Sequence, residues 1–288
     1  MRFTQLNPFA VTVYYLCILA VTMFSMNPLL LCIALVTSVL SAVLTHTANR
    51  KNHLFSLAVF VVAAALNPIF VHKGLTVLFY FNGNPVTLEA TLYGLSAAMM
   101  LTSALYRLRD LSKALTSDKV LYLFGRISPK LALLLSMTLR FVSLLRVRWR
   151  RIQDSQKALG LYDDGNLIDA VRGRARVLGI LITWTLENGI VTAESMESRG
   201  YNSGRRTSYA VYRVHAADVL FILVCLSLTA LTATGIWQSK AVYYPELDMR
   251  LFSPWGLAGA AAFTLLSVLP LIINIKEAIR WRLLLSKT

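Results

Sequence analysis

Apolar residues gather into six long runs along this chain, and short polar or basic stretches separate the runs. Several of these runs approach or pass the roughly 20 residues that an α-helix needs to cross the hydrocarbon core of a bilayer. Proline in Asn27-Pro28 separates the first two runs, because it restrains the preceding residue to extended conformations. The pattern therefore predicts six transmembrane helices, at about residues 9–26, 29–44, 54–70, 88–105, 214–236 and 254–273.

A shorter apolar piece, residues 75–81, lies between the third and fourth runs. The turn sequence Asn82-Gly83-Asn84-Pro85 follows it. The piece is too short to cross a bilayer, so we expect an interfacial or re-entrant segment.

Between residues 107 and 213 the chain becomes basic, with nine Arg or Lys residues from Arg140 to Arg176. An Arg or Lys costs about 2.5–3.5 kcal/mol at the centre of a membrane helix, so this stretch is excluded from the hydrocarbon. Five apolar residues still recur there at helical spacing, which predicts one face of a long amphipathic helix. They are Phe141, Leu145, Trp149, Ile152 and Leu159, and the turn residues 163–166 end the helix.

Residues 177–196 are apolar enough to resemble a span, but their second half carries Glu187 and Glu194, and Glu197 follows. We therefore expect a helix packed against protein at the cytoplasmic face. If this segment crossed the membrane instead, the basic Arg205-Arg206 loop would lie outside, against the positive-inside rule.

The composition fits a membrane protein: 56% of the 288 residues are hydrophobic, only 15% are charged, and the mean hydropathy is +0.59. The net charge of +15 does not indicate nucleic-acid binding, because Lys and Arg crowd the ends of apolar runs and the central region. That distribution predicts cytoplasmic N- and C-termini. We expect an all-α integral membrane protein with a bundle of about four spans (1–106), a cytoplasmic region of long amphipathic helices (107–213), and about two further spans with a cytoplasmic tail (214–288).

Reactive side chains do not converge in the sequence. The four histidines (His46, His53, His72 and His215) lack helical spacing for a metal, and we interpret the cysteines (Cys17, Cys32 and Cys225) as core or lipid-facing residues. One acidic group, Asp163, Asp164 and Asp169, allows an alternative: a membrane-embedded, magnesium-dependent enzyme of the prenyltransferase kind. A free-standing transporter or channel is a further alternative, although the predicted spans contain almost no ionisable residues.

Two short stretches end the predicted amphipathic helices: Ala158-Leu159-Gly160 and Ser198-Arg199-Gly200. Glycine adopts the left-handed conformation that ends helices, and a cation suits the negative end of the helix dipole. Either tripeptide alone is better explained as a helix terminus than as a site. Two such termini, roughly 40 residues apart in a membrane protein, form a constellation.

These two stretches resemble the coupling-helix signatures of the transmembrane T component (EcfT/CbiQ-like) of energy-coupling-factor (ECF) transporters. The resembling segments are residues 151–161 and 194–201, and the membrane-helix frame matches over most of the chain. The family signature is Ala-Arg-Gly at the end of each of two long cytoplasmic helices. Here Leu159 replaces the first arginine, and Ser198 replaces the second alanine.

The resemblance implies a non-catalytic subunit without a cofactor of its own, in the cytoplasmic (inner) membrane of a bacterium. Two cytoplasmic ATP-binding subunits would bind ATP, and this chain would transmit their motion to a small membrane substrate-binding (S) subunit that takes up a vitamin or a transition metal. The ATPase-coupling residues would be Ala158, Leu159, Gly160, Ser198, Arg199 and Gly200, supported by Arg151, Lys157, Glu194 and Glu197. Arginine suits this contact because its planar fork binds carboxylates bidentately. Leu159 cannot make that contact, so we expect the two coupling sites to differ. The small-residue stretches 38–42 and 256–262 would serve either the S subunit or packing within the bundle.

Overall fold

A computed structural model describes residues 7–45, 49–71, 74–81, 84–161, 167–201, 203–204, 212, 214–239, 241–244, 248–249 and 253–285. The chain divides into two compact units. The first unit comprises residues 1–120 together with 212–288, and the second comprises residues 121–211.

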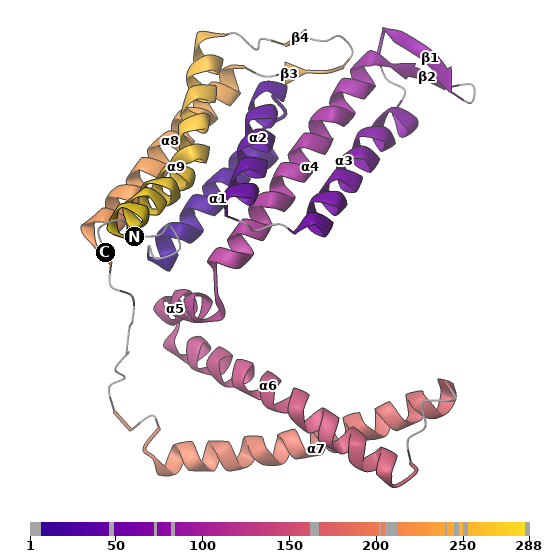
Figure 1. Cartoon of the computed structure of the whole chain (residues 1–288), viewed down its shortest axis with the longest axis vertical. Coiled ribbons are helices and arrows are strands. Elements are labelled where there is room, and N and C mark those ends of the chain that lie inside the picture. The colour runs from indigo at the N-terminus through magenta and orange to yellow at the C-terminus, as the bar shows by residue number, and fades with distance from the viewer. Residues whose placement is uncertain are drawn as a thin grey trace. The chain divides into compact units, whose positions relative to one another are not determined.

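The first unit is a bundle of apolar helices (Figure 1). Helices α3, α4 and α8 and the first 20 residues of α9 are long and apolar enough to cross a membrane, while α1 and α2 have 17 residues each, at the lower limit for a span. Each predicted span coincides with one of these helices, so the all-α membrane fold is confirmed. The helices are α1 (Pro8–Phe24), α2 (Pro28–Leu44), α3 (Arg50–Phe70), α4 (Leu88–Ala114), α8 (Ala216–Gln238) and α9 (Pro254–Leu285).

Helices α1 and α2 begin in the same way, with asparagine as N-cap and proline in the first turn. The Asn7 side chain accepts a hydrogen bond from the Phe9 amide at 3.0 Å, and the Asn27 side chain accepts one from the Leu29 amide at 3.1 Å. Each bond satisfies a backbone donor that the helix itself leaves unpaired, and proline has no such donor. The predicted break at Asn27-Pro28 is therefore confirmed.

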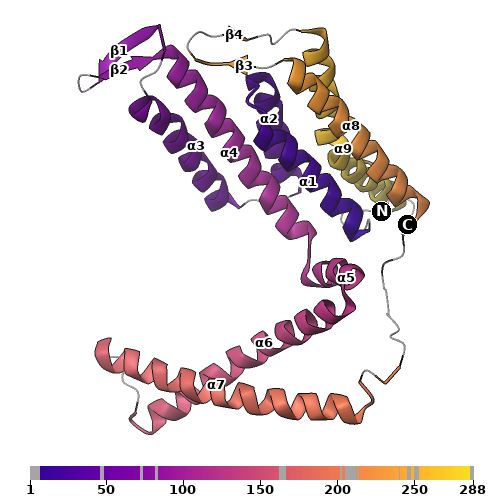
Figure 2. The ribbon, with the colours of Figure 1, turned by 180° about the vertical axis from the view of Figure 1, so that it is seen from behind.

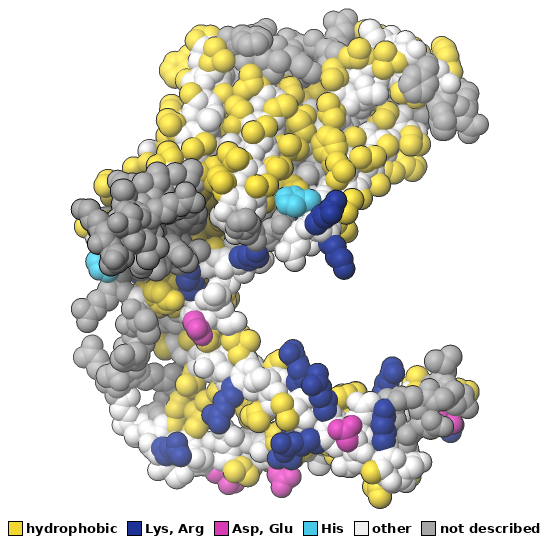
Figure 3. Space-filling view, viewed as in Figure 1, with side chains coloured by type: hydrophobic (Ala, Val, Ile, Leu, Met, Phe, Trp, Pro, Cys, Tyr) yellow, Lys and Arg dark blue, Asp and Glu magenta, His cyan; other side chains and the backbone are white. Residues whose placement is uncertain are grey.

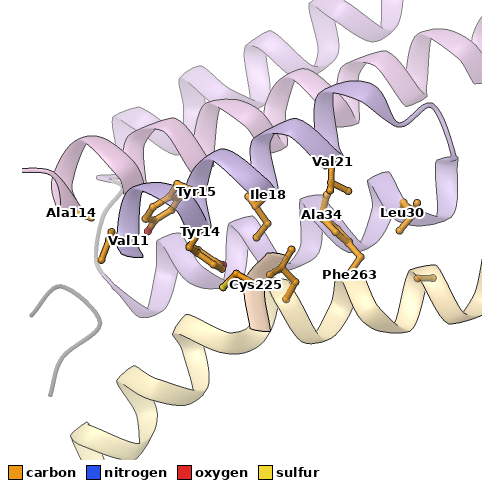
Figure 4. Close-up of a cluster of buried hydrophobic side chains, with 12 residues drawn as sticks. Val11, Tyr14, Tyr15, Ile18, Val21, Leu30, Ala34, Ala114, Cys225 and Phe263 are labelled. Atoms are coloured by element: carbon orange, nitrogen blue, oxygen red, sulfur yellow. The ribbon is translucent and has the colours of Figure 1, made fainter. Parts of the chain in front are cut away.

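The core of the bundle joins helices from both ends of the sequence (Figure 4). Tyr14 and Ile18 of α1 are buried together with Ala34 of α2, Cys225 of α8 and Phe263 of α9. All three cysteines are free thiols, as expected. Cys17 is buried like Cys225, and Cys32 lies on α2 with its sulfur 3.4 Å from that of Met99. Segments that are 200 residues apart in sequence thus form one core.

Helices α8 and α9 approach closely at a pair of glycines. A Cβ atom added to Gly235 would lie 2.8 Å from the Cα of Gly259 and 2.8 Å from the Trp255 carbonyl oxygen. On α2, Ser38, Ser41 and Ala42 are likewise buried. The small-residue stretches 38–42 and 256–262 are expected from the sequence either to contact an S subunit or to pack within the bundle. These contacts show packing within the bundle.

We expect Gly235→Ala to lower the melting temperature of the purified chain in detergent, since the new methyl group meets backbone atoms that cannot move aside. Overpacking of this kind costs about 1–3 kcal/mol. Gly189→Ala is the matched control: Gly189 lies within a helix of the second unit, nothing lies within 4 Å of its added Cβ, and alanine favours the helix by about 1 kcal/mol. Opposite shifts in circular-dichroism melting curves are expected, and a tolerated Gly235→Ala would contradict the close approach.

Helix α4 corrects one expectation from the sequence. The apolar run predicts a span that ends near residue 105, whereas the helix itself continues unbroken to Ala114. Arg107 is 2% exposed and donates to Thr37 Oγ1 at 3.0 Å, and Asp110, also buried, accepts from Ser41 Oγ at 2.7 Å. Hydropathy marks only where the apolar run ends. The Thr37 and Ser41 hydroxyl groups of α2 bind Arg107 and Asp110, so α4 continues within the bundle although this part of the helix is charged.

The short apolar piece between α3 and α4 forms a β-hairpin. Strand β1 (Val77–Phe81) pairs antiparallel with β2 (Asn84–Thr87), and Tyr80 lies opposite Pro85. Cross-strand pairing satisfies the backbone groups of the piece, and its interfacial or re-entrant position stays a prediction. A second, smaller hairpin joins α8 to α9 through β3 (Ala241–Val242) and β4 (Asp248–Met249).

The second unit consists mainly of two long helices, α6 (Pro129–Ala158) and α7 (Leu167–Ser198), which cross each other in both views (Figures 1 and 2). Helix α5 (Ser117–Ile127) leads from the first unit into this one and was not predicted. The amphipathic face of α6 is confirmed at Phe141, Leu145, Trp149 and Ile152, which are half-buried on a helix that is otherwise mostly exposed. Leu159 does not belong to this face, since it lies beyond the last helical residue and is 69% exposed.

Candidate functional site

The end of α6 is a Schellman motif, a common way for a helix to stop. Leu159 is the C-cap, and Gly160 follows with φ of +69°. The amide of Gly160 donates to the Lys157 carbonyl at 3.0 Å, and the amide of Leu161 donates to the Gln156 carbonyl at 3.0 Å. Only glycine adopts this left-handed conformation without strain, so the cap explains the residue type at position 160.

The end of α7 repeats this geometry residue for residue. Arg199 is at the C-cap, and Gly200 has φ of +78°. The Gly200 amide donates to the Glu197 carbonyl at 2.9 Å, and the Tyr201 amide donates to the Met196 carbonyl at 3.0 Å. The interpretation of both tripeptides as helix termini is thus confirmed, and Leu159 and Arg199 occupy equivalent positions.

The two caps lie at opposite ends of the crossed pair (Figures 1 and 2). Helix α6 has 30 residues and α7 has 32, so each is about 45–48 Å long at 1.5 Å per residue. The structure therefore does not bring Leu159 and Arg199 together. It provides two separate surfaces, each presenting one C-cap side chain to solvent.

The small residues before each cap are exposed as well. Ala158 ends α6, and Ser198 ends α7 with its hydroxyl donating to the Glu194 carbonyl at 2.7 Å. That bond turns the Ser198 hydroxyl back onto its own helix, so serine presents little more than alanine would. Four other side chains expected to support the caps lie within two turns of them and are also exposed: Arg151, Lys157, Glu194 and Glu197.

The helices are held together at the crossing by a narrow seam. On α7, Ala170, Val177 and Leu181 are buried at helical spacing. Arg148 of α6 lies over the ring of Trp184 of α7, with 4.9 Å between the guanidinium carbon and the ring centroid. A cation over an indole ring adds about 0.5–1 kcal/mol at an exposed site. Sequence periodicity indicates that Trp149 faces a partner, but it does not reveal the contact between Arg148 and Trp184.

A further contact ties the start of α7 to the cap of α6. Arg176 Nη1 donates to the Leu161 carbonyl oxygen at 3.3 Å, directly after the Schellman turn. This hydrogen bond is a second link between α7 and the end of α6, in addition to the seam.

Much of the remaining surface of α6 and α7 is apolar or basic. All nine basic residues between Arg140 and Arg176 are exposed, and Lys and Arg gather over these helices (Figure 3). Apolar side chains are exposed beside them, among them Val142, Val147, Leu186, Ile190 and Val191. Helices α6 and α7 pack together only along one seam and expose large apolar side chains on their other faces. Such exposed apolar surface is typical of a protein that binds partners through it. Helix α7 is not among the helices long and apolar enough to span. Most apolar side chains of residues 177–196 are exposed, so the expected packing against protein is seen only at Val177 and Leu181, and the position of this stretch at the cytoplasmic face stays a prediction.

The alternative chemistry finds no support in the described residues. Asp163 and Asp164 lie outside them, Asp169 is exposed on the first turn of α7, and no group of His, Cys, Asp or Glu that could hold a metal occurs in the part of the chain that the structure describes. Two histidines have structural contacts: His53 Nδ1 lies 2.9 Å from the Tyr106 hydroxyl, and His215 caps α8. His46 and His72 lie outside the described residues.

Comparison with known proteins gives one family and several relatives. Residues 3–209, which include both caps, match the family model described as CbiQ, cobalt transport protein. The energy-coupling factor transporter transmembrane protein EcfT of Streptococcus thermophilus is 33% identical over 135 residues, covering 46% of this chain and 50% of the relative. EcfT of Lactobacillus helveticus is 33% identical over 115 residues, covering 39% and 42% respectively. This chain thus spans about half the length of the curated relatives it matches.

Proposed function

Because the chain belongs to the CbiQ family of cobalt transport proteins, we propose that it is the transmembrane coupling (T) subunit of an ECF-type importer. In this proposal it has no catalytic activity and no cofactor of its own. Two cytoplasmic subunits bind and hydrolyse ATP, and a small membrane protein, the S subunit, binds the solute. The chain would lie in the bacterial cytoplasmic membrane with both termini inside.

One observation carries the proposal: two geometrically equivalent helix caps lie at opposite ends of a crossed pair of long helices. Two ATP-binding subunits need two separate docking points on one coupling subunit, and this arrangement supplies them. Arg199 would bind a carboxylate of one ATPase with its planar guanidinium. Leu159 would pack against an apolar surface on the other, with Arg151 and Lys157 near it. The pair of ATPases would then be asymmetric.

The helices would act as levers. Each is a continuous helix, and the seam of Val177, Leu181 and the Arg148–Trp184 contact lies between the two caps. When the ATPases close or open, the two cap ends move, and helices pinned at a crossing rotate about it. The exposed apolar side chains of α7 would pass this rotation to the S subunit, which would carry a vitamin or a transition-metal ion such as cobalt or nickel.

The test is the composition of the complex. The tagged full-length chain, purified from its native membranes in mild detergent, is expected to retain ATP-hydrolysing subunits and a small membrane protein, identified by mass spectrometry. The purified complex should hydrolyse ATP, whereas the chain expressed alone should not. The identity of the small protein would indicate the solute. Purification of the chain without ATPases would contradict the proposal.

A further inference from the structure

An open apolar groove lies between α3 and α4 of the first unit. Its volume is about 270 Å³. Helix α3 packs against the bundle along one side only, and Ser56 is its one buried side chain among those described. The groove is therefore open along its length, and its lining is wholly aliphatic: Ala58, Val59, Val62, Ala63 and Leu66 of α3 with Leu101 of α4.

Cations gather at one end of this groove. Arg50 and Lys51 form the first turn of α3 and are exposed, and α3 contains no acidic residue. Figure 3 shows Lys and Arg side chains at this end of the bundle. Arg109 of α4 lies at the same end, where its Nη1 donates to Ser56 Oγ at 2.7 Å and to the Asn52 carbonyl at 3.1 Å. The groove thus has an aliphatic body and a positively charged entrance.

Helix stability does not explain these cations. The N-terminus of a helix carries partial positive charge, so Arg and Lys in the first turn are disfavoured by about 0.3–1 kcal/mol each. Asn49, the N-cap, makes no side-chain capping bond either. The positive-inside rule explains why basic residues flank a span, but it does not determine which groove of the bundle they lie beside.

The spacing between cations and groove matches a phospholipid. Residues 58 and 66 lie 8 and 16 positions after Arg50, which corresponds to about 12 and 24 Å along a helix axis. One leaflet contributes about 15 Å of hydrocarbon, so a phosphate at this end of α3 places an acyl chain beside the near half of the groove. Lys51 is seven residues before Ala58 and lies on the groove face of α3, whereas Arg50 is about 100° further round the helix and would reach the phosphate from the side. Basic pockets between membrane helices are known to bind anionic head groups.

We propose that the α3–α4 groove binds an anionic phospholipid, with its phosphate held by Arg50 and Lys51 and one acyl chain lying along Ala63. A membrane helix from a partner could also fill an aliphatic groove, but it would leave the two cations without an anion. The lipid satisfies both features of the site.

The first test removes the cations. The full-length chain in detergent is titrated with dioleoylphosphatidylglycerol or dioleoylphosphatidylcholine, and bound lipids are counted by native mass spectrometry. Arg50→Gln with Lys51→Gln is expected to weaken phosphatidylglycerol binding about thirtyfold, from the usual contribution of two cations at a membrane surface. The control is Arg146→Gln with Arg150→Gln, an exposed pair one turn apart on α6 that removes the same charge. It should leave binding unchanged.

The second test fills the groove without touching charge or topology. Ala63→Trp puts an indole where the acyl chain would lie, whereas Leu57→Trp adds an indole at an exposed position outside the groove lining. Leu57 lies about 140° from Val62 and 180° from Leu66 around the helix, so the control faces away from most of the lining. Loss of phosphatidylglycerol with Ala63→Trp alone is the expected result.

Three outcomes would overturn the proposal. The first is equal binding of the two lipids by the wild-type chain. The second is an equal loss in both double-glutamine variants, which would indicate a diffuse charge effect. The third is unchanged lipid binding in Ala63→Trp together with loss of a co-purifying membrane protein, which would assign the groove to a partner helix.

Discussion

Replacement of Arg199 by leucine is expected to weaken the association of one ATP-binding subunit by about thirtyfold or more, with little effect on the fold of the chain. The fold should be little changed because Leu159 already occupies the equivalent C-cap position at the end of α6. The weaker association follows from the chemistry of the proposed contact. Removing one partner of a desolvated, hydrogen-bonded charge pair costs about 2–5 kcal/mol, which is thirtyfold at the lower limit.

The measurement is the affinity of the purified ATP-binding subunits for the full-length chain in nanodiscs, with ATP hydrolysis of the assembled complex as a second readout. Arg140→Leu is the control, since Arg140 is an exposed arginine in the middle of α6, away from both caps. It should change affinity little, because isolated surface charges contribute about 0–1 kcal/mol.

The reciprocal change tests whether the two caps serve different subunits. Leu159→Arg restores a guanidinium to the chain, but at the opposite end of the crossed helices. It is therefore not expected to rescue Arg199→Leu. Full rescue would contradict two separate docking points, and an unchanged affinity in Arg199→Leu alone would reduce Ser198-Arg199-Gly200 to a helix terminus and nothing more.

The sequence predicts the parts of this molecule that depend on local physical chemistry. Apolar runs locate six helices, because a membrane span needs a minimum length of apolar side chains. Gly160 and Gly200 mark two helix termini, because a left-handed residue is needed there. Asn27-Pro28 marks a helix start for an equally local reason. The residue pattern alone is therefore enough to locate both candidate caps at the ends of basic helices.

Features that depend on contacts between distant segments are not predictable in this way. The pairing of residues 77–81 with 84–87 depends on cross-strand bonds, and a short apolar piece alone does not distinguish a strand from an interfacial segment. The opposed placement of the two caps depends on the crossing of α6 and α7, where Arg148 meets Trp184. In the sequence, Arg107 resembles the first residue of a basic loop. Its burial depends on the Thr37 hydroxyl of α2, a partner 70 residues away that the local sequence does not indicate.

The second prediction with a large expected effect concerns the buried Arg107. Arg107→Met is expected to lower the free energy of unfolding by about 3–5 kcal/mol, the usual cost of removing one of two opposite buried charges and leaving the other uncompensated. Arg107 and Asp110 are both buried one turn apart on α4, so they lie on the same face of the helix. Arginine stays protonated, and its loss would leave the buried Asp110 without the nearby positive charge.

Arg109→Met is the matched control, because Arg109 lies two residues further on and is only half-buried, and it bonds the Asn52 carbonyl and the Ser56 hydroxyl rather than lying beside an opposite buried charge. It should cost clearly less than Arg107→Met. Unfolding of the full-length chain in detergent, followed by circular dichroism against denaturant, measures both.

The double variant Arg107→Met with Asp110→Leu is expected to recover most of the lost stability, since apolar replacement of a whole buried pair is often neutral. The hydroxyl groups that served the pair keep other acceptors: Thr37 Oγ1 also donates to the Ile33 carbonyl at 2.8 Å, and Ser41 Oγ to the Ser38 carbonyl at 2.9 Å. No buried donor is therefore stranded when both charges are removed. If the double variant is no more stable than Arg107→Met alone, the electrostatic attraction between Arg107 and Asp110 contributes little. The arginine would then stabilise the bundle mainly through the packing of its large buried side chain.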